Sequence, residues 1–368
     1  MPTQTNDSET NRHIALSGEA EPPLYRSRYG GLWIDRRDAL DILDGRRARG
    51  EITDADAEVL AHYIDQGYVV FPKATDESVI DEFLAVFEDA WNAPPDDIFL
   101  HWKRQYPLLM DRKLYDEVTK VGEMHTCFER AGELIFPPEV LRFLTQIYER
   151  PPVAFQTMTM RKGSEENLHI DTGPLTLTEP MSMAASWVAL EDVQPLSGEF
   201  QFIPGSHHLP ELLHYGTDKG HGGDYQEYDK ILKTTLRMCE ERGLETKTFM
   251  AKKGDVLIWH ADLMHGGIPI EDGQRTRKSL VAHFMPYGVM PTFFDASEVN
   301  AIPYAEGGYF LDARWHATEK KQQRGDDRPV AHRGKTRPVQ LWREWVPLSV
   351  RKRVPPSFAA WARKHVPH

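Results

Sequence analysis

The sequence predicts a mainly β fold with flanking helices, a sandwich or jelly roll, and two observations support this expectation. From Ala154 onward, short apolar segments alternate with turn residues, which is typical of antiparallel sheets and not of a parallel one. Before Ala154 the apolar residues follow a helical spacing instead. We therefore predict strands over residues 155–160, 168–171, 183–190, 198–203, 247–250, 255–259 and 278–286.

Two amphipathic helices around one short strand are predicted ahead of this sheet. Thr53 is a suitable N-cap for the first helix, and Gly67 ends it. Residues 68–72 form a short apolar strand that closes on a proline. The second helix begins at residues 75–77. The residues at helical spacing are Val59, Leu60, Tyr63, Ile64, Val79, Ile80, Phe83, Leu84, Phe87 and Trp91.

A long excursion separates the predicted strands 198–203 and 247–250. Its second half, residues 225–242, has a helical pattern that ends at Gly243. Its first half contains residues 216–224, which are rich in Gly, His and Asp, and we expect a mobile flap there.

Size and composition indicate a protein of the cytoplasm. The chain has 368 residues, of which 40% are hydrophobic and 27% charged, as in ordinary globular proteins. No apolar run approaches the roughly 18 residues of a membrane span, and the first residues do not resemble a secretory signal. Cys127 and Cys239 are the only cysteines. A single disulfide between them stays possible, but two isolated cysteines without a signal fit a reducing compartment better.

Charge is distributed unevenly along the chain. The net charge is −12, yet residues 310–368 carry fourteen Lys/Arg against five Asp/Glu, which leaves the remainder strongly acidic. Four of the nine tryptophans lie in this basic tail. The tail could fold back on the acidic body, or it could contact an anionic membrane surface or an acidic carrier. Nucleic acid is not expected as a partner, because no recognition motif accompanies the charge.

Two histidines and one aspartate form a candidate metal site. In an extended segment, side chains two residues apart project from the same face, so His169 and Asp171 can bind one ion together. His265, from a distant segment, would complete the set, with His260 as the rival for this position. Two imidazoles and one carboxylate occupy one face of an octahedral ion and leave the other face open, as in non-haem Fe(II) oxygenases.

An arginine and a serine shortly after His265 suggest how a co-substrate would bind. A 2-oxo acid can chelate iron while its far carboxylate needs a cationic partner, and arginine donates two parallel hydrogen bonds to such a group. We expect Arg277 and Ser279 in this role, with Arg275 as the rival arginine. If strands 255–259 and 278–286 are neighbours, Arg277, Ser279, Val281 and His283 alternate onto one face.

Several motifs in a fixed order resemble one family. The stretch from residue 53 to about 287 is similar to the phytanoyl-CoA dioxygenase-like family of Fe(II)/2-oxoglutarate oxygenases. The motifs that carry the resemblance are GYVVFP at 67–72, KGSEENLHID at 162–171, WVALED at 187–192, GEFQFIPGSH at 198–207, GDVLIWH at 254–260, HG at 265–266 and RKS at 277–279.

The resemblance implies a double-stranded β-helix, a cupin-like jelly roll, with helices packed outside it. It implies Fe(II), 2-oxoglutarate and O2 as the reaction partners. Carried over to this chain, His169, Asp171 and His265 match the iron ligands and Arg277 the co-substrate clamp. Trp187 matches a family tryptophan near the co-substrate, although it could also simply fill the barrel.

Residues 25–305 would then form the oxygenase domain, with a helical flap at 208–248. Residues 1–24 would be a disordered tail, and residues 306–368 a basic, Trp-containing extension outside the resemblance. The chain departs from the family at one place: the family often has His-Gly-Ser and then an asparagine, whereas Gly267 follows Gly266 here.

The expected activity is a 2-oxoglutarate-dependent hydroxylation of an unactivated C–H bond, with release of succinate and CO2. The substrate would be a small organic or carrier- or lipid-linked molecule. Asp171 favours hydroxylation over halogenation, because related halogenases replace this carboxylate with a small residue. The alternatives are a cupin-type metal-dependent isomerase or small-ligand-binding protein, which would not need Arg277, and an oxygenase-derived scaffold that acts through its tail.

Overall fold

The computed structural model describes residues 24–102, 105–172, 174–209, 225–292, 301–304 and 307–311. The predicted N-terminal tail apart from Leu24, the glycine-rich part of the flap, and the basic extension beyond residue 311 lie outside these residues.

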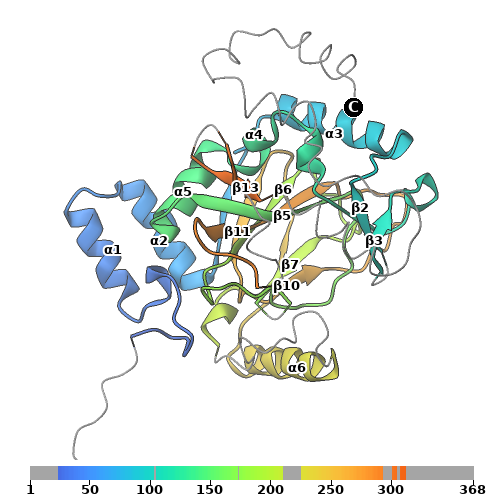
Figure 1. Cartoon of the computed structure of the whole chain (residues 1–368). Helices are drawn as coiled ribbons and strands as arrows, with labels where there is room; N and C mark the ends of the chain where they lie inside the picture. The colour runs from blue at the N-terminus through green and yellow to red at the C-terminus, as the bar shows by residue number, and fades with distance from the viewer. Residues whose placement is uncertain are drawn as a thin grey trace, which may run out of the picture.

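Two β-sheets face each other, and helices cover the outer sides of both (Figure 1). In the described part of the chain, the large sheet has the strand order β1-β9-β6-β11-β5-β4-β2-β3, with β13 beside β5 and β12 beside β13. The small sheet has the order β10-β7-β8. All pairings except β13 with β5 are antiparallel, so the predicted mainly β jelly roll is confirmed.

The strands of the large sheet are short and come from the whole length of the described chain. They are β1 (Tyr68–Phe71), β2 (Phe99–Trp102), β3 (Gln105–Leu109), β4 (Lys120–Gly122), β5 (Pro152–Met160), β6 (Ala184–Ala189), β9 (Val256–His260), β11 (Ser279–Pro286), β12 (Ala301–Pro303) and β13 (Tyr309–Leu311). The small sheet consists of β7 (Phe200–Phe202), β8 (Lys247–Phe249) and β10 (His265–Gly267).

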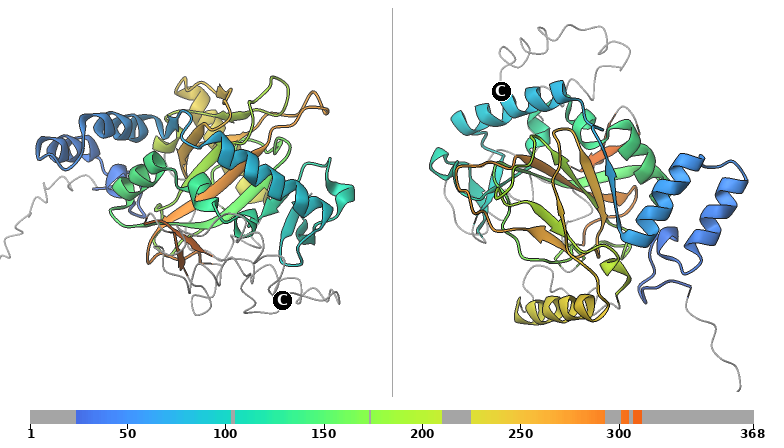
Figure 2. Two further views of the ribbon diagram at one scale, coloured as in Figure 1. Left: turned by 90° about the horizontal axis from the view of Figure 1, so that it is seen from above. Right: turned by 180° about the vertical axis from the view of Figure 1, so that it is seen from behind.

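Six α-helices surround the sheets within the described residues: α1 (Ala39–Ala48), α2 (Asp54–Gln66), α3 (Glu77–Asn92), α4 (Ala131–Ile135), α5 (Pro138–Tyr148) and α6 (Tyr225–Glu241). Helices α1 and α2 lie together at one edge, and α6 lies beside the small sheet (Figure 1). Helix α3 runs across the outer face of the large sheet (Figure 2). None of these helices combines the length and the apolar character that crossing a bilayer requires.

The alternation of side chains along the strands builds two cores. One face of the large sheet packs against the helices through residues such as Ile258 and Leu280. The opposite face carries Trp187 and Trp259, which pack against the small sheet. Both faces are buried, so these strands are apolar along nearly their whole length.

Helix α2 begins and ends as the sequence predicts. The Thr53 hydroxyl accepts a hydrogen bond from Asp56 N at 3.0 Å, which satisfies one free amide of the first turn. Gly67 ends the helix with a φ of +77°. A Cβ atom at residue 67 would also collide with the imidazole of His207, so only glycine fits here.

One prediction from the sequence is wrong, and one assumption about neighbouring strands is not met. Residues 168–171 form no strand; they begin with a bend, end in a turn and make one isolated bridge, from His169 to His265. Strands β9 and β11 are not neighbours, because β6 lies between them and pairs with both. Periodicity reports which face a residue occupies but not which strand lies beside it. Three of the four residues predicted to share one face of the sheet do so, since Ser279, Val281 and His283 alternate along β11; Arg277 precedes this strand.

The burial of His207 should make the fold acid-sensitive. Burial, with the neighbouring His260 and His208, lowers the pKa of His207 well below its ordinary value. The unfolded chain takes up this proton below about pH 6.5 and the folded chain does not, so stability is fully present above that pH and falls as pH decreases. His207→Gln keeps a donor for Ile64 O and should reduce this slope by up to about 1.4 kcal/mol per pH unit.

The measurement is urea unfolding of both proteins at about pH 7 and about pH 5. His62→Gln, at an exposed histidine of helix α2, is the matched control. Equal pH dependence in wild type and His207→Gln would show that His207 does not couple stability to pH.

Candidate metal centre

Backbone hydrogen bonds bring the three predicted metal ligands together. His169 N donates to His265 O at 2.8 Å, and His265 N donates to His169 O at 2.9 Å. Asp171 N donates to Ala261 O at 2.9 Å, in the loop that precedes His265. The extended segment between β5 and β6 is thereby held against the start of β10, and the three side chains project to one side.

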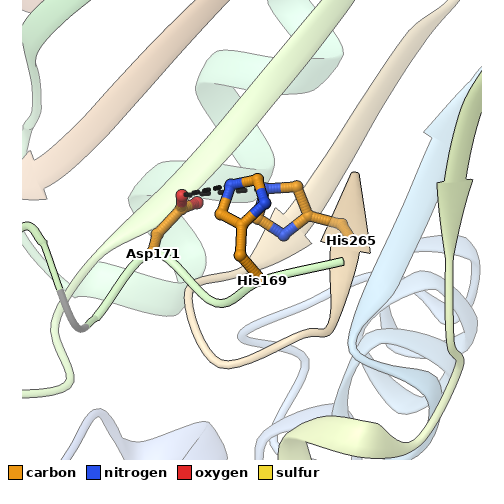
Figure 3. Close-up of side chains that lie close together, drawn as sticks. All are labelled: His169, Asp171 and His265. Carbon is orange, nitrogen blue, oxygen red and sulfur yellow. Dashed lines mark ion pairs between the residues drawn. The ribbon is translucent and has the colours of Figure 1, made fainter. Parts of the chain in front are cut away.

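The ligand atoms of His169, Asp171 and His265 lie within 4.8 Å of one another. Nε2 of His169 is 3.8 Å and Nε2 of His265 3.6 Å from the same oxygen, Oδ1 of Asp171. Figure 3 shows the two imidazoles side by side and directed toward the carboxylate. The arrangement matches the two-histidine, one-carboxylate set of non-haem iron sites.

Each imidazole is held in the form that a metal requires. Nδ1 of His169 donates to Asn167 O at 2.8 Å, and Nδ1 of His265 donates to Leu263 O at 2.9 Å. With the proton on Nδ1, the lone pair of each ring is on Nε2, the atom that faces Asp171. The donors therefore fit a divalent metal ion without any change of tautomer.

The charges of the site also favour a metal. Burial raises the pKa of Asp171, but the nearby His265 and His283 outweigh it and hold this pKa below its usual range. Burial lowers the pKa of His265 to about 4, against the opposing effect of Asp171. At neutral pH the carboxylate is ionised and His265 is neutral, which are the protonation states of metal ligands.

Two residues that were not predicted to contact the metal ligands lie beside the second oxygen of Asp171. Trp259 Nε1 donates to Asp171 Oδ2 at 2.9 Å, and Nε2 of His283 lies 3.7 Å from the same oxygen. Both residues lie on the inner face of the large sheet. They leave Oδ1 as the oxygen that faces the two histidines, so Asp171 is oriented to bind through one oxygen. Their positions on the inward-facing side of strands β9 and β11 are the only feature of the sequence that pointed to these contacts with Asp171.

The predicted co-substrate residues lie together in the interior. The Arg277 side chain is 1% exposed, and its Cζ lies 5.4 Å from the ring centroid of Trp187. Its Nη1 donates to Gly198 O at 2.9 Å, and its Nε has no partner in the described part of the protein. Burial lowers the pKa of Arg277 to about 10, while the charges of Glu166 and Glu199 oppose this shift.

No carboxylate among the described residues forms an ion pair with Arg277. A buried cation without a counter-ion is costly, by several kcal/mol, unless an anion joins it. The hydroxyl of Ser279, two residues further along, is also buried without a partner. Arg277 and Ser279 are therefore polar groups arranged for an anionic ligand.

The rival residues have other partners. Arg275 is partly exposed and pairs with Asp272 at 2.8 Å on the surface. Nε2 of His260 lies 3.0 Å from Oδ1 of Asp35, and His260 is not part of the metal cluster.

Close backbone contact explains the departure from the family at residue 267. A Cβ atom on Gly266 would lie 2.5 Å from Glu166 O, and one on Gly267 would lie 2.7 Å from the Ser164 hydroxyl. The segment before His169 crosses here and fills the space that a serine side chain would need. Residue 266 must therefore be glycine, and a side chain at residue 267 would have to displace the Ser164 hydroxyl.

Helix α6 covers the outer side of the ligand segment. Its Leu232 and Leu236 pack in an apolar cluster with Leu168 and Ile170. The Tyr228 hydroxyl donates to Ile170 O at 2.8 Å, between the two ligands of this segment. The sequence predicted the helix but not this contact.

One family model matches the chain, and several solved structures share its fold. A family model described as phytanoyl-CoA dioxygenase matches residues 63–279. No curated protein matches the sequence. Among solved structures, the non-heme alpha ketoglutarate dependent carbocyclase SnoK from nogalamycin biosynthesis is 18% identical over 66% of this chain and 87% of that one, with a TM-score of 0.50. The epimerase SnoN, in complex with Fe3+, alpha ketoglutarate and nogalamycin RO, is 19% identical over 70% and 98%, with the same TM-score of 0.50. At these identities the likeness shows the fold.

Removing the hydrogen bond to Asp171 should weaken metal binding. Trp259→Phe keeps the ring but not the N–H, so Oδ2 of Asp171 loses its closest donor. We expect the affinity for Co(II) to fall about tenfold, the usual effect of losing a hydrogen bond to a ligating group. Calorimetric titration of metal-free protein measures it.

Trp91→Phe is the matched control, because Trp91 is equally buried in helix α3 and its Nε1 has no partner among the described residues. Unchanged affinity in Trp259→Phe would mean that Trp259 does not position Asp171.

Proposed function

The chain belongs to the phytanoyl-CoA dioxygenase family of iron- and 2-oxoglutarate-dependent oxygenases, and from this premise we propose that it is a hydroxylase. It would oxidise an unactivated C–H bond of a small organic or carrier- or lipid-linked substrate and release succinate and CO2. Residues 25–305 would form the oxygenase domain.

Three residues would hold the iron. His169 and His265 would present their Nε2 atoms, and Asp171 would present one carboxylate oxygen. With iron, 2-oxoglutarate and O2 bound, such a site couples decarboxylation of the 2-oxo acid to oxidation of a C–H bond. The chain itself fixes the ligand geometry and leaves one side of the ion for the co-substrate and O2.

Arg277 is the single observation that carries the proposal. Its buried guanidinium lacks an ion pair among the described residues and would bind the far carboxylate of 2-oxoglutarate, with the Ser279 hydroxyl beside it. Trp187 would form the wall of this pocket, next to the guanidinium. A metal-dependent isomerase or a ligand-binding cupin that does not bind 2-oxoglutarate would not need the buried guanidinium of Arg277.

Asp171 supports hydroxylation or another oxidative outcome over halogenation. A halogenase needs a free coordination position where this carboxylate stands; here Trp259 donates to the carboxylate, and Nε2 of His283 lies 3.7 Å from it. SnoK and SnoN are named a carbocyclase and an epimerase, so the fold accommodates other oxidative outcomes.

The substrate would approach from the side of His169. Its side chain is 20% exposed, whereas those of Asp171 and His265 are 6% and 5% exposed. Contact of the basic extension with a membrane or a carrier, and a cytoplasmic location, stay predictions from the sequence.

Loss of Arg277 should impair co-substrate binding but not metal binding. Arg277→Gln removes a charge-assisted contact worth about 1.5–3 kcal/mol, so the KM for 2-oxoglutarate should rise at least about tenfold. Succinate release, with and without substrate candidates, measures it. Arg275→Gln, at the partly exposed neighbouring arginine, should leave this KM unchanged. An unaltered KM in Arg277→Gln would contradict the assignment.

His169→Ala should abolish succinate formation, because it removes one of three metal ligands. Mass spectrometry of the product then identifies the outcome: gain of one oxygen atom indicates hydroxylation. A wild-type protein that binds metal but neither binds 2-oxoglutarate nor forms succinate would favour the isomerase or ligand-binding alternative.

A further inference from the structure

An N-terminal segment outside the family match reaches the loop that carries a metal ligand. The match begins at residue 63, whereas Asp35 lies in the short 3-10 helix η1 (Trp33–Asp35). Oδ1 of Asp35 lies 3.0 Å from Nε2 of His260, the last residue of β9. Both side chains are almost fully buried, at 12% and 5% exposed.

We propose that Asp35 is a positioning residue for the metal centre, acting through His260; the inference rests on the proposed metal site. Asp35 fixes which nitrogen of His260 carries the proton. His260 in turn holds the loop 261–264, which contacts two of the three metal ligands.

The hydrogen bonds of His260 define its tautomer. Asp35 accepts only from a protonated Nε2, and Asp262 N donates to Nδ1 at 3.1 Å, which requires an unprotonated Nδ1. Asp35 raises the pKa of His260 against the effect of burial, but the amide of Asp262 needs the acceptor that only the neutral ring offers. Without Asp35, the proton could move to Nδ1 and would then face the amide of Asp262.

The loop transmits this arrangement to the ligands. Leu263 N donates to His260 O at 2.8 Å, so the side chain and the backbone of His260 together close the turn. Ala261 O accepts from Asp171 N, and Leu263 O accepts from Nδ1 of His265 at 2.9 Å. A displaced loop would therefore move Asp171, which is bound to Ala261 O. It would also move Leu263 O, the carbonyl that keeps the proton of His265 on Nδ1.

Asp35 itself is rigidly placed. Its second oxygen, Oδ2, accepts from Leu32 N at 2.7 Å. Beside it, Trp33 is buried, donates from Nε1 to Gln146 O at 3.0 Å, and packs against the guanidinium of Arg46 at 4.4 Å. The carboxylate is held at both oxygens, as an orienting group must be.

Asp35→Ala tests the proposal, with Asp38→Ala as the matched control. Asp38 lies in the same segment but pairs with Arg36 and not with the loop. In metal-free protein, hydrogen exchange at the amide of Asp262 should become at least about tenfold faster in Asp35→Ala only. The affinity for Co(II), measured by calorimetry well below the melting temperature, should fall about fivefold in the same variant.

A lowered melting temperature with unchanged exchange and unchanged Co(II) affinity would show a merely structural role and overturn the proposal. Faster exchange without weaker Co(II) binding would equally overturn it, because the loop would not then act on the ligands.

A pair of substitutions at His260 decides the matter if Asp35→Ala does not fold. His260→Asn places an acceptor near the position of Nδ1, and His260→Gln places a donor near that of Nε2. If the acceptor at Nδ1 is what holds the loop, His260→Asn should bind Co(II) more tightly than His260→Gln, and equal or reversed affinities would overturn the proposal.

A wild-type protein that fails to bind Co(II) would overturn the proposed function. Normal Co(II) binding by the wild type together with unchanged binding by Asp35→Ala would overturn this inference alone.

Discussion

Two backbone hydrogen bonds between His169 and His265 join segments that lie far apart in the sequence, and the metal centre depends on them. This bridge sets the distance between the two imidazoles and directs both toward Asp171. The contact is close enough that no side chain fits on Gly266, where a Cβ would lie 2.5 Å from Glu166 O. The two glycines after His265 are therefore part of the site, although they bind nothing.

Two buried charged side chains, Asp171 and Arg277, differ in the partners that surround them. The charge of Asp171 is stabilised before any metal binds, because Trp259 donates its N–H to Oδ2, whereas Oδ1 faces the Nε2 atoms of His169 and His265. Arg277 is equally buried but has no counter-ion among the described residues. A buried charge without a counter-ion lowers the stability of the fold, and proteins retain one where function requires it. The three candidate metal ligands all come from the chain, whereas Arg277 would pair with an anion supplied by the proposed co-substrate.

The outer helical layer also contributes to the centre. Helix α6 is connected to the ligand segment through Tyr228, and the N-terminal segment is connected to the loop before His265 through Asp35 and His260. Two segments outside the sheets thus contact the parts of the chain that carry or precede the metal ligands. Positioning by groups that never touch the substrate is common in metal centres, because each ligand needs a fixed orientation as well as a fixed distance.

The sequence by itself determined the candidate metal ligands and the local structure. The spacing of His169 and Asp171 and the later His265 predicted the metal cluster, and Thr53 and Gly67 predicted the ends of one helix, because these signals depend on neighbours along the chain. The role of Arg277 and Ser279 stays a prediction. Only the tertiary structure placed β6 between β9 and β11, left 168–171 outside the sheets, and gave Asp171 and His260 their partners. Trp259 is 88 residues from Asp171, and Asp35 is 225 residues from His260. Contacts of that range are fixed by strand order and register, which periodicity does not encode.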